Sequence, residues 1–183
     1  MGQRLQEITP ELRLAIEQAP LFFVATAPNS ASGHVNLSPK GHGTLRVLDS
    51  RRVAYLDLTG SGNETAAHVT QNGRLTFMVC AFSGRPQILR LFCQGRVVTK
   101  TSAEWQELGP LFPSLTGTRQ IIVGDVEFLQ TSCGYAVPEM SFVVQRDTLV
   151  RWAEGKGEAG LVDYRRTRNI ESIDGVPAPP TDG

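Results

Sequence analysis

The amino-acid sequence predicts a mainly β protein with peripheral helices. Seven runs are rich in β-branched and aromatic residues, and Gly, Pro, Asn or Asp separates each run from the next, which is typical of strands joined by turns. The chain has 183 residues, 40% of them hydrophobic, so it can bury one substantial core. Seven strands around one core imply a barrel or a sandwich.

The expected elements begin with a helix. Thr9 and Pro10 form a cap and first-turn pair, apolar residues follow at helical spacing, and Pro20 ends the helix. The strands are then expected at residues 21–27, 34–38, 44–48, 53–58, 75–82, 88–99 and 120–130.

Three further helices are expected between and after the strands. One follows Asn63, and a second is predicted by Thr101 and Glu104, which have the spacing of a capping box. A third begins at Asp147 and continues through an Arg-rich stretch. The chain then ends in GVPAPPTDG, which we expect to be an extended tail unless it docks on the rest of the protein.

The charge balance excludes several function classes. Eighteen basic residues match eighteen acidic ones, so no broad electrostatic field points to nucleic acid or an anionic membrane. No apolar run approaches the roughly 20 residues of a spanning helix, and MGQRLQEITPEL lacks the apolar core of a signal peptide. We therefore expect a cytoplasmic protein whose partner is a small molecule.

Neither a disulfide framework nor a metal centre is expected. Cys80, Cys93 and Cys133 are odd in number and lack CxxC spacing, which favours buried or free thiols. The histidines at positions 34, 42 and 68 have no carboxylate or Cys partner at the spacing of metal ligands.

The stretch DLTGSGNETAAH lies between a predicted strand and a predicted helix. In a purely structural interpretation its glycines supply the positive φ of a tight turn, and Ser61 or Asn63 caps the helix. In a functional interpretation, backbone N–H groups and the hydroxyls of Thr59, Ser61 and Thr65 bind a phosphate, which the helix dipole also favours. The P-loop and dinucleotide fingerprints both fail here, so a phosphate would belong to a different kind of site.

Five motifs occur along the chain in the order FFVATA, GHVNLSPKG, YLDLTGSGNETAAHVTQNGR, ILRLFCQGRVV and SCGYAVP. In this order the sequence resembles the flavin-binding relatives of pyridoxamine 5′-phosphate oxidase, over about residues 21–175. The resemblance implies a split β-barrel that dimerises around two FMN molecules. It implies a split-barrel flavin-binding domain with an N-terminal helix at residues 1–145, followed by a helical C-terminal extension and tail at 146–183.

The resemblance also implies which residues bind FMN. Lys40 matches a lysine at the phosphate, and Asn36 and Ser38 lie on the same strand facing the cofactor. Arg90 falls where the oxidases have a glutamine that reaches the isoalloxazine ring. The phosphate loop matches at Thr59, Asn63, Glu64 and Thr65, and the hydroxyl of Ser61 completes it.

Physical chemistry supports part of this assignment and leaves part open. A phosphomonoester carries up to two negative charges, so a nearby cation should contribute much of its binding. Taken from spacing alone, Lys40 would be an exposed loop residue, and Arg90 would fit an edge strand that faces water. Glu64 either complements the helix dipole or binds through its N–H while its carboxylate turns away.

The end of the chain differs from that of the oxidases. RNIESIDGVPAPPTDG lacks their pattern of tryptophan, arginine and histidine, which argues against vitamin B6 oxidation. We expect an FMN-dependent oxidoreductase that exchanges a hydride through flavin N5 with an unidentified small substrate, and no catalytic residue is evident. The alternatives are a non-catalytic flavin-binding or sensing protein, an F420-dependent reductase and a haem-binding relative.

The expected ring site also predicts the assembly. A barrel this small has a filled interior, so the isoalloxazine ring should lie on an outer face and need a second protomer to cover it. A homodimer follows, with Ser132 to Pro138 and the helix around Trp105 as candidate contributions from the partner.

Overall fold

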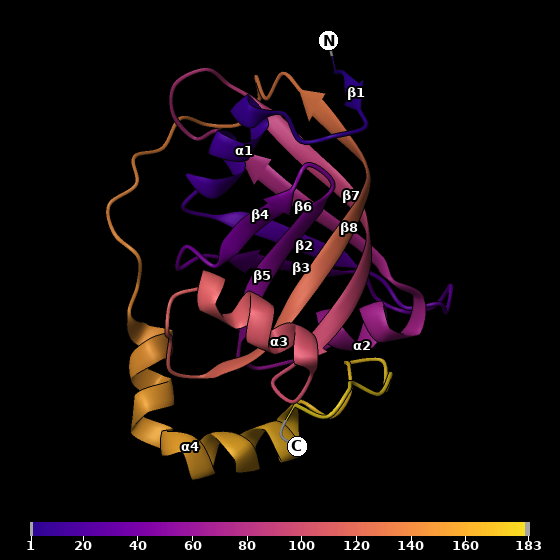
Figure 1. Ribbon diagram of the computed structural model, residues 1–183, viewed down its shortest axis with the longest axis vertical. Coiled ribbons are helices and arrows are strands. Elements are labelled where there is room, and N and C mark those ends of the chain that lie inside the picture. Colours follow the sequence, from indigo (N-terminus) through magenta and orange to yellow (C-terminus); the bar gives the residue numbers. More distant parts are fainter. Residues whose placement is uncertain (1, 182–183) are drawn as a thin grey trace.

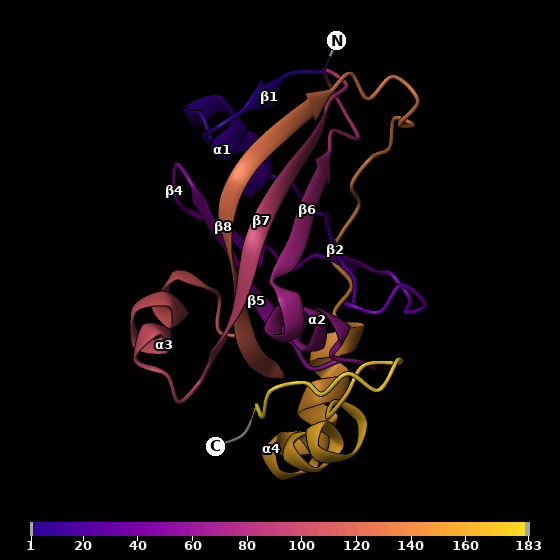
Figure 2. The same ribbon diagram turned by 90° about the vertical axis from the view of Figure 1, so that its right-hand side faces the viewer.

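The computed structural model describes residues 2–181 as one strongly curved antiparallel sheet with four α-helices around it (Figures 1 and 2). The helices are α1 (Pro10–Glu17), α2 (Glu64–Asn72), α3 (Ala103–Leu108) and α4 (Thr148–Arg168). The strands are β1 (Arg4–Leu5), β2 (Phe22–Thr26), β3 (Asn36–Lys40), β4 (Leu45–Asp49), β5 (Arg52–Leu58), β6 (Arg74–Cys80), β7 (Ile88–Thr99) and β8 (Thr118–Ser132).

The sheet follows one path through its strands, in the order β3-β2-β6-β7-β8-β5-β4, and β1 adds to β8. β8 pairs with β7 over most of its length and also with β5. It therefore joins the two halves of the sheet. β3 and β4 are the two edges, and the loop of residues 41–44 connects them directly.

The main core fills the inner face of this curved sheet. Phe22, Tyr55 and Phe77 are fully buried there, and Tyr55 meets both phenylalanine rings edge to face, with centroids 5.6 and 6.0 Å apart. Such edge-to-face contacts add to the stabilisation that burial provides. Leu12 and Ile16 of α1 close the same core from one side. A smaller apolar cluster lies under α3.

The seven predicted strands are all present, with ends displaced by up to two residues. β7 occupies residues 88–99 as predicted, whereas β3 lies two residues later than expected. β1 was not predicted, because its two residues owe their strand conformation to pairing with β8. Tertiary pairing of this kind leaves no local signal.

The capping box predicted for α3 is wrong by one residue. Ser102, not Thr101, caps the helix, and its hydroxyl accepts a hydrogen bond from the Trp105 N–H at 3.3 Å. The Glu104 carboxylate bonds Arg96 of β7 instead of the helix terminus. Glu104 therefore forms an ion pair with a neighbouring strand and does not return a hydrogen bond to the N-terminus of its own helix.

The C-terminal segment docks on the body of the protein, so it is not a free extended tail. α4 begins after Asp147 as predicted and changes direction at Gly157, whose φ is +63°. After Arg168 the chain turns back beneath α2, and Asn169, Ser172 and Thr181 are buried (Figure 2). No helix within residues 2–181 is long and apolar enough to cross a membrane.

Candidate functional site

A buried acid, Asp57, lies at the centre of a polar network at the end of β5. Its Oδ2 accepts hydrogen bonds from Arg119 Nη2 at 2.7 Å, Arg119 Nε at 3.0 Å and Gln120 Nε2 at 2.8 Å. Its Oδ1 accepts one from Lys40 Nζ at 3.3 Å. Burial alone would raise the pKa of Asp57, but the charges of Arg119 and Lys40 outweigh burial and hold this pKa below its usual value. The carboxylate is therefore ionised at neutral pH.

The same network fixes the loop that follows β5. Gln120 Nε2 also donates to Asn63 Oδ1 at 2.8 Å, and Arg119 Nη1 donates to the Gly62 carbonyl at 3.0 Å. Both partners belong to the predicted phosphate loop. Two side chains of β8 thus restrain the loop, and the Asn63 side chain has a structural role in it.

The start of α2 brings three predicted residues together. Asn36 Nδ2 donates to Thr65 Oγ1 at 3.2 Å and to Thr26 Oγ1 at 3.1 Å, and Ser38 Oγ donates to Asn36 Oδ1 at 2.8 Å. Asn36 and Ser38 pair across the sheet with Thr26 and Val24 of β2, which face the interior. The predicted row of polar side chains on β3 therefore faces inward, toward α2.

This end of the interior has unsatisfied polar groups, which fits a bound polar ligand. Among the described residues, no side chain caps α2, so its first N–H groups point out of the helix end. Three buried side-chain atoms also have no hydrogen-bond partner of good geometry within residues 2–181. These are Tyr55 Oη, His68 Nε2 and Gln120 Oε1. Native proteins rarely leave such groups unpaired, so these three atoms call for a polar partner at this end of the interior.

The remaining loop residues have different environments. Thr59 Oγ1 is buried and accepts a hydrogen bond from Arg165 Nη1 of α4 at 3.2 Å. The Glu64 carboxylate accepts the Ile173 N–H with both oxygens at 3.1 Å, so it turns away from the helix end toward the C-terminal segment. Ser61 is exposed, and the structure does not bring it to the cluster.

Arg90 also lies outside this cluster, on the opposite face of the sheet. Its neighbours Leu89 and Leu91 face the core, so Arg90 faces outward. Its Nη1 donates to Ser132 Oγ at 3.3 Å. Across the strands it lies in one row with Met78, Phe23 and Pro39. The predicted ring contact and the predicted phosphate contacts are therefore on two faces of the same sheet.

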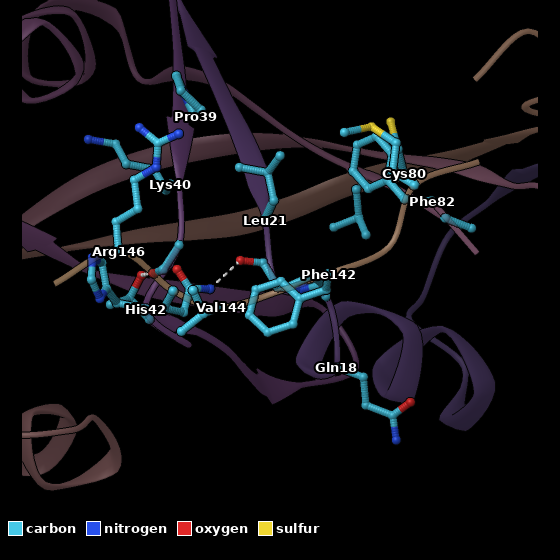
Figure 3. A pocket seen from close by; sticks show the side chains of 18 of the residues that line it. Gln18, Leu21, Pro39, Lys40, His42, Cys80, Phe82, Phe142, Val144 and Arg146 are labelled. Atoms are coloured by element: carbon cyan, nitrogen blue, oxygen red, sulfur yellow. Dashed lines mark hydrogen bonds between the residues drawn. The ribbon is translucent and has the colours of Figure 1, made fainter. Parts of the chain in front are cut away.

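A cleft of about 1110 Å³, here called the seam cleft, lies beside the loop of residues 41–44 that connects the two edge strands (Figure 3). Residues 140–146 cross it as an extended strap, held by Met140 N to the Phe82 carbonyl at 2.7 Å and by Gln145 Nε2 to the Pro20 carbonyl at 2.8 Å. Figure 3 shows Lys40, His42 and Arg146 at one end of this cleft.

The rest of the cleft is largely apolar, with side chains such as Leu21, Phe82 and Phe142 in its wall. Among the described residues that line it there is no Asp or Glu. Residues 2–181 also contain no group of three or more His, Cys, Asp or Glu side chains that could hold a metal ion.

Asp57, Arg119 and Gln120 belong to this cluster but were not predicted from the sequence. A signal was present, because Asp57 interrupts the apolar run VAYLDL and the Arg119-Gln120 pair precedes the apolar run IIV. Charged residues in buried strands need partners. The partner could not be identified from sequence, since 62 residues separate Asp57 from Arg119.

Comparison with known proteins identifies the family. Residues 8–131 match the family model described as pyridoxamine 5′-phosphate oxidase. A pyridoxamine 5′-phosphate oxidase family protein, ustO of Aspergillus flavus, is 36% identical over 198 residues, covering 94% of this chain and 76% of the relative.

Solved structures have the same fold at low sequence identity. A HupZ variant from Group A Streptococcus has a TM-score of 0.54 and 20% identity, covering 68% of this chain and 99% of that one. A putative pyridoxamine 5′-phosphate oxidase from Lactobacillus delbrueckii has a TM-score of 0.51 and 17% identity, covering 68% and 93%. These matches confirm the predicted split β-barrel. With two-thirds of its length matched by one family model and a curated relative along nearly all of it, the chain belongs to the pyridoxamine 5′-phosphate oxidase family.

Proposed function

We propose that the protein binds FMN, with the phosphate at the start of α2. The observation that carries this proposal is the contact of Asn36 with Thr65 beside an uncapped helix terminus. The free N–H groups and the helix dipole favour an anion there, and the Thr65 hydroxyl, which accepts a hydrogen bond from Asn36, can donate one to the phosphate. Lys40 and Arg119 place two positive charges around Asp57 close by, which leaves a net positive charge to balance the phosphate.

The isoalloxazine ring would lie on the outer face near Arg90. β3, β2, β6 and β7 are neighbours in the sheet, so Arg90 lies about three strand spacings, roughly 14 Å, from the edge strand β3. Apolar side chains are available on this face, since Leu37 is 62% exposed and Phe23 and Met78 are half-buried. An open apolar face of this kind favours coverage by a second copy. This is the basis for proposing a homodimer.

The seam cleft would receive a small anionic substrate. Its apolar wall suits an organic body, and Arg146 at one end favours a carboxylate or a phosphate. Bound FMN would supply hydride exchange at its N5 atom, and the protein would supply orientation and charge. Together these features support an oxidoreductase.

A cofactor titration tests this proposal. FMN, F420 and haemin are added in turn to the purified protein while absorbance and flavin fluorescence are followed. We expect saturable FMN binding by the wild type, a roughly ten-fold weaker affinity for Thr65→Val, and no change for Thr101→Val, an exposed threonine outside the site. Binding of F420 or haemin in place of FMN would reject FMN as the cofactor, and equal affinities of both variants would move the phosphate elsewhere.

The assembly and the reaction need separate measurements. Light scattering of the FMN-loaded protein should give a mass near twice the 20.0 kDa of one chain, and the mass of a single chain would reject a shared ring site. Anaerobic reduction of bound FMN by candidate anionic donors tests turnover. A flavin that binds tightly and is never reduced would favour the sensing alternative.

A further inference from the structure

The C-terminal segment makes an unusual concentration of contacts with the loop of residues 59–65. We propose that residues 165–174 form a latch that sets the conformation of this loop, and that Asn169 is its main positioning residue. The inference rests on the proposed function only for its consequence, namely that the latched loop is the form that binds FMN.

Asn169 contacts the loop directly through two groups and indirectly, through Arg119, with a third. Its Nδ2 donates to the Gly60 carbonyl at 3.1 Å, and its backbone carbonyl accepts from Asn63 Nδ2 at 3.3 Å. Its Oδ1 accepts from Arg119 Nη1 at 2.8 Å, and the same nitrogen donates to the Gly62 carbonyl at 3.0 Å. Asn169 is only 3% exposed, so few of these bonds compete with bulk water.

Two further residues of the latch, one before and one after Asn169 in the sequence, contact the two ends of the loop. Arg165 of α4 donates to Thr59 at the beginning of the loop, and the Ile173 N–H bonds the carboxylate of Glu64 at its end. Beyond the loop, the Asp174 carboxylate accepts from the His34 N–H and also bonds His34 Nδ1, both at 2.7 Å. The latch therefore spans the full length of the loop and ends on the connection between β2 and β3.

Apart from the bonds of Gln120 to Asn63 and of Arg119 to Gly62 described above, the loop has few other restraints within residues 2–181. Glycines occupy positions 60 and 62, and neither has a positive φ. The backbone between Thr59 and Asn63 can therefore adopt several conformations, since no single turn type requires these glycines. Within the loop, the N–H of Thr59 bonds the Gly117 carbonyl. Asn169 is the residue that joins Gly60, Asn63 and, through Arg119, Gly62. Its removal should free the loop and leave the sheet intact.

Hydrogen exchange of the protein without added cofactor tests the latch directly. In Asn169→Ala we expect amide exchange in residues 59–65 to accelerate about ten-fold, while β7 and β8 exchange as in the wild type. Asn169→Asp keeps the acceptor for Arg119 but places a carboxylate oxygen against the Gly60 carbonyl, so exchange in residues 59–65 should accelerate in this variant as well. Arg168→Ala is the matched control, because Arg168 is exposed and is the last residue of α4, directly before Asn169.

FMN titration of the same variants then measures the consequence. Asn169→Ala should bind FMN about ten-fold more weakly than Arg168→Ala. Unchanged loop exchange in Asn169→Ala, or acceleration spread evenly over the whole chain, would overturn the latch. If the faster exchange of Asn169→Ala is confined to the loop but Asn169→Ala and Arg168→Ala bind FMN equally well, the latch has no role in FMN binding. If no variant or wild type bound FMN, the exchange result would still decide the latch, and only the proposed function would fall.

Discussion

The buried acid at the centre of the network gives the sharpest test of the structure. Asp57 is 2% exposed and receives four hydrogen bonds, and the guanidinium of Arg119, its main partner, is 3% exposed. Asp57→Asn would leave Arg119 buried beside a neutral amide. Removal of one partner from a buried ion pair costs about 3–5 kcal/mol, which corresponds to a fall in melting temperature of roughly 6–20 °C for a chain of this size.

The pH dependence of stability gives an independent measure of the same interaction. Because the folded-state pKa of Asp57 is depressed, its contribution to stability is present above the unfolded pKa of about 3.9 and is lost as pH falls through the lower folded pKa. The difference in stability between wild type and Asp57→Asn should therefore be constant near neutral pH and shrink toward acid pH.

The assay is urea unfolding followed by circular dichroism between pH 7 and the acid limit of the native state. Asp49→Asn is the control, because Asp49 pairs with Arg52 at the surface and exposed pairs contribute about 0–1 kcal/mol. The double variant Asp57→Asn, Arg119→Gln should recover part of the loss. A loss for Asp57→Asn no larger than that of the control, at every pH, would refute the buried ion pair.

Three further perturbations test the site and the packing. Lys40→Ala should weaken FMN binding ten-fold or more, since a charged hydrogen bond contributes about 1.5–3 kcal/mol, and titration of Lys100→Ala gives the baseline. A thiol reagent should label the exposed Cys133 of the native protein but react with Cys93 only after unfolding, because Cys93 is buried and burial raises the pKa of its thiol. Rapid labelling of Cys93 in the native protein would contradict its buried position. Gly95→Ala should destabilise the protein by about 1–3 kcal/mol, because a Cβ there would lie 2.9 Å from Leu75 Cδ2. Gly160→Ala on α4 should stabilise it by about 0.5–1 kcal/mol, because the new Cβ meets only Lys156 Cβ at 3.4 Å. Equal shifts in melting temperature for the two variants would disprove this packing.

Local sequence patterns predicted the strands well because each strand carries its own signal. The run ILRLFCQGRVVT is rich in β-branched and large apolar residues, and β7 occupies all twelve of its residues. The loop and helix after β5 were found in the same way, from hydroxyl residues and glycines ahead of a short helical run. These features depend on neighbours in sequence, which a single chain displays directly.

The network around the site could not be predicted to the same degree. The contacts of Asp57 with Arg119 and of Asn169 with Gly60 join residues 62 and 109 positions apart. Which buried polar groups meet is decided by strand register and by where the C-terminal segment docks, and neither leaves a local pattern. The inward direction of Asn36 and the outward direction of Arg90 likewise followed only once the pairing of β2, β3, β6 and β7 was known.

The position of β8 between β7 and β5 has a consequence for how the chain folds during its own synthesis. The hairpin of β4 and β5 is complete once residue 58 has been made, but its attachment to the other strands requires β8, which ends at residue 132. At 5–20 residues per second a ribosome needs roughly 4–15 s to make the intervening chain. For that time the apolar faces of β4 and β5 have no sheet to join, so the nascent protein depends on chaperones or on α1 to shield them, and nonsense or frameshift products that stop before β8 should aggregate.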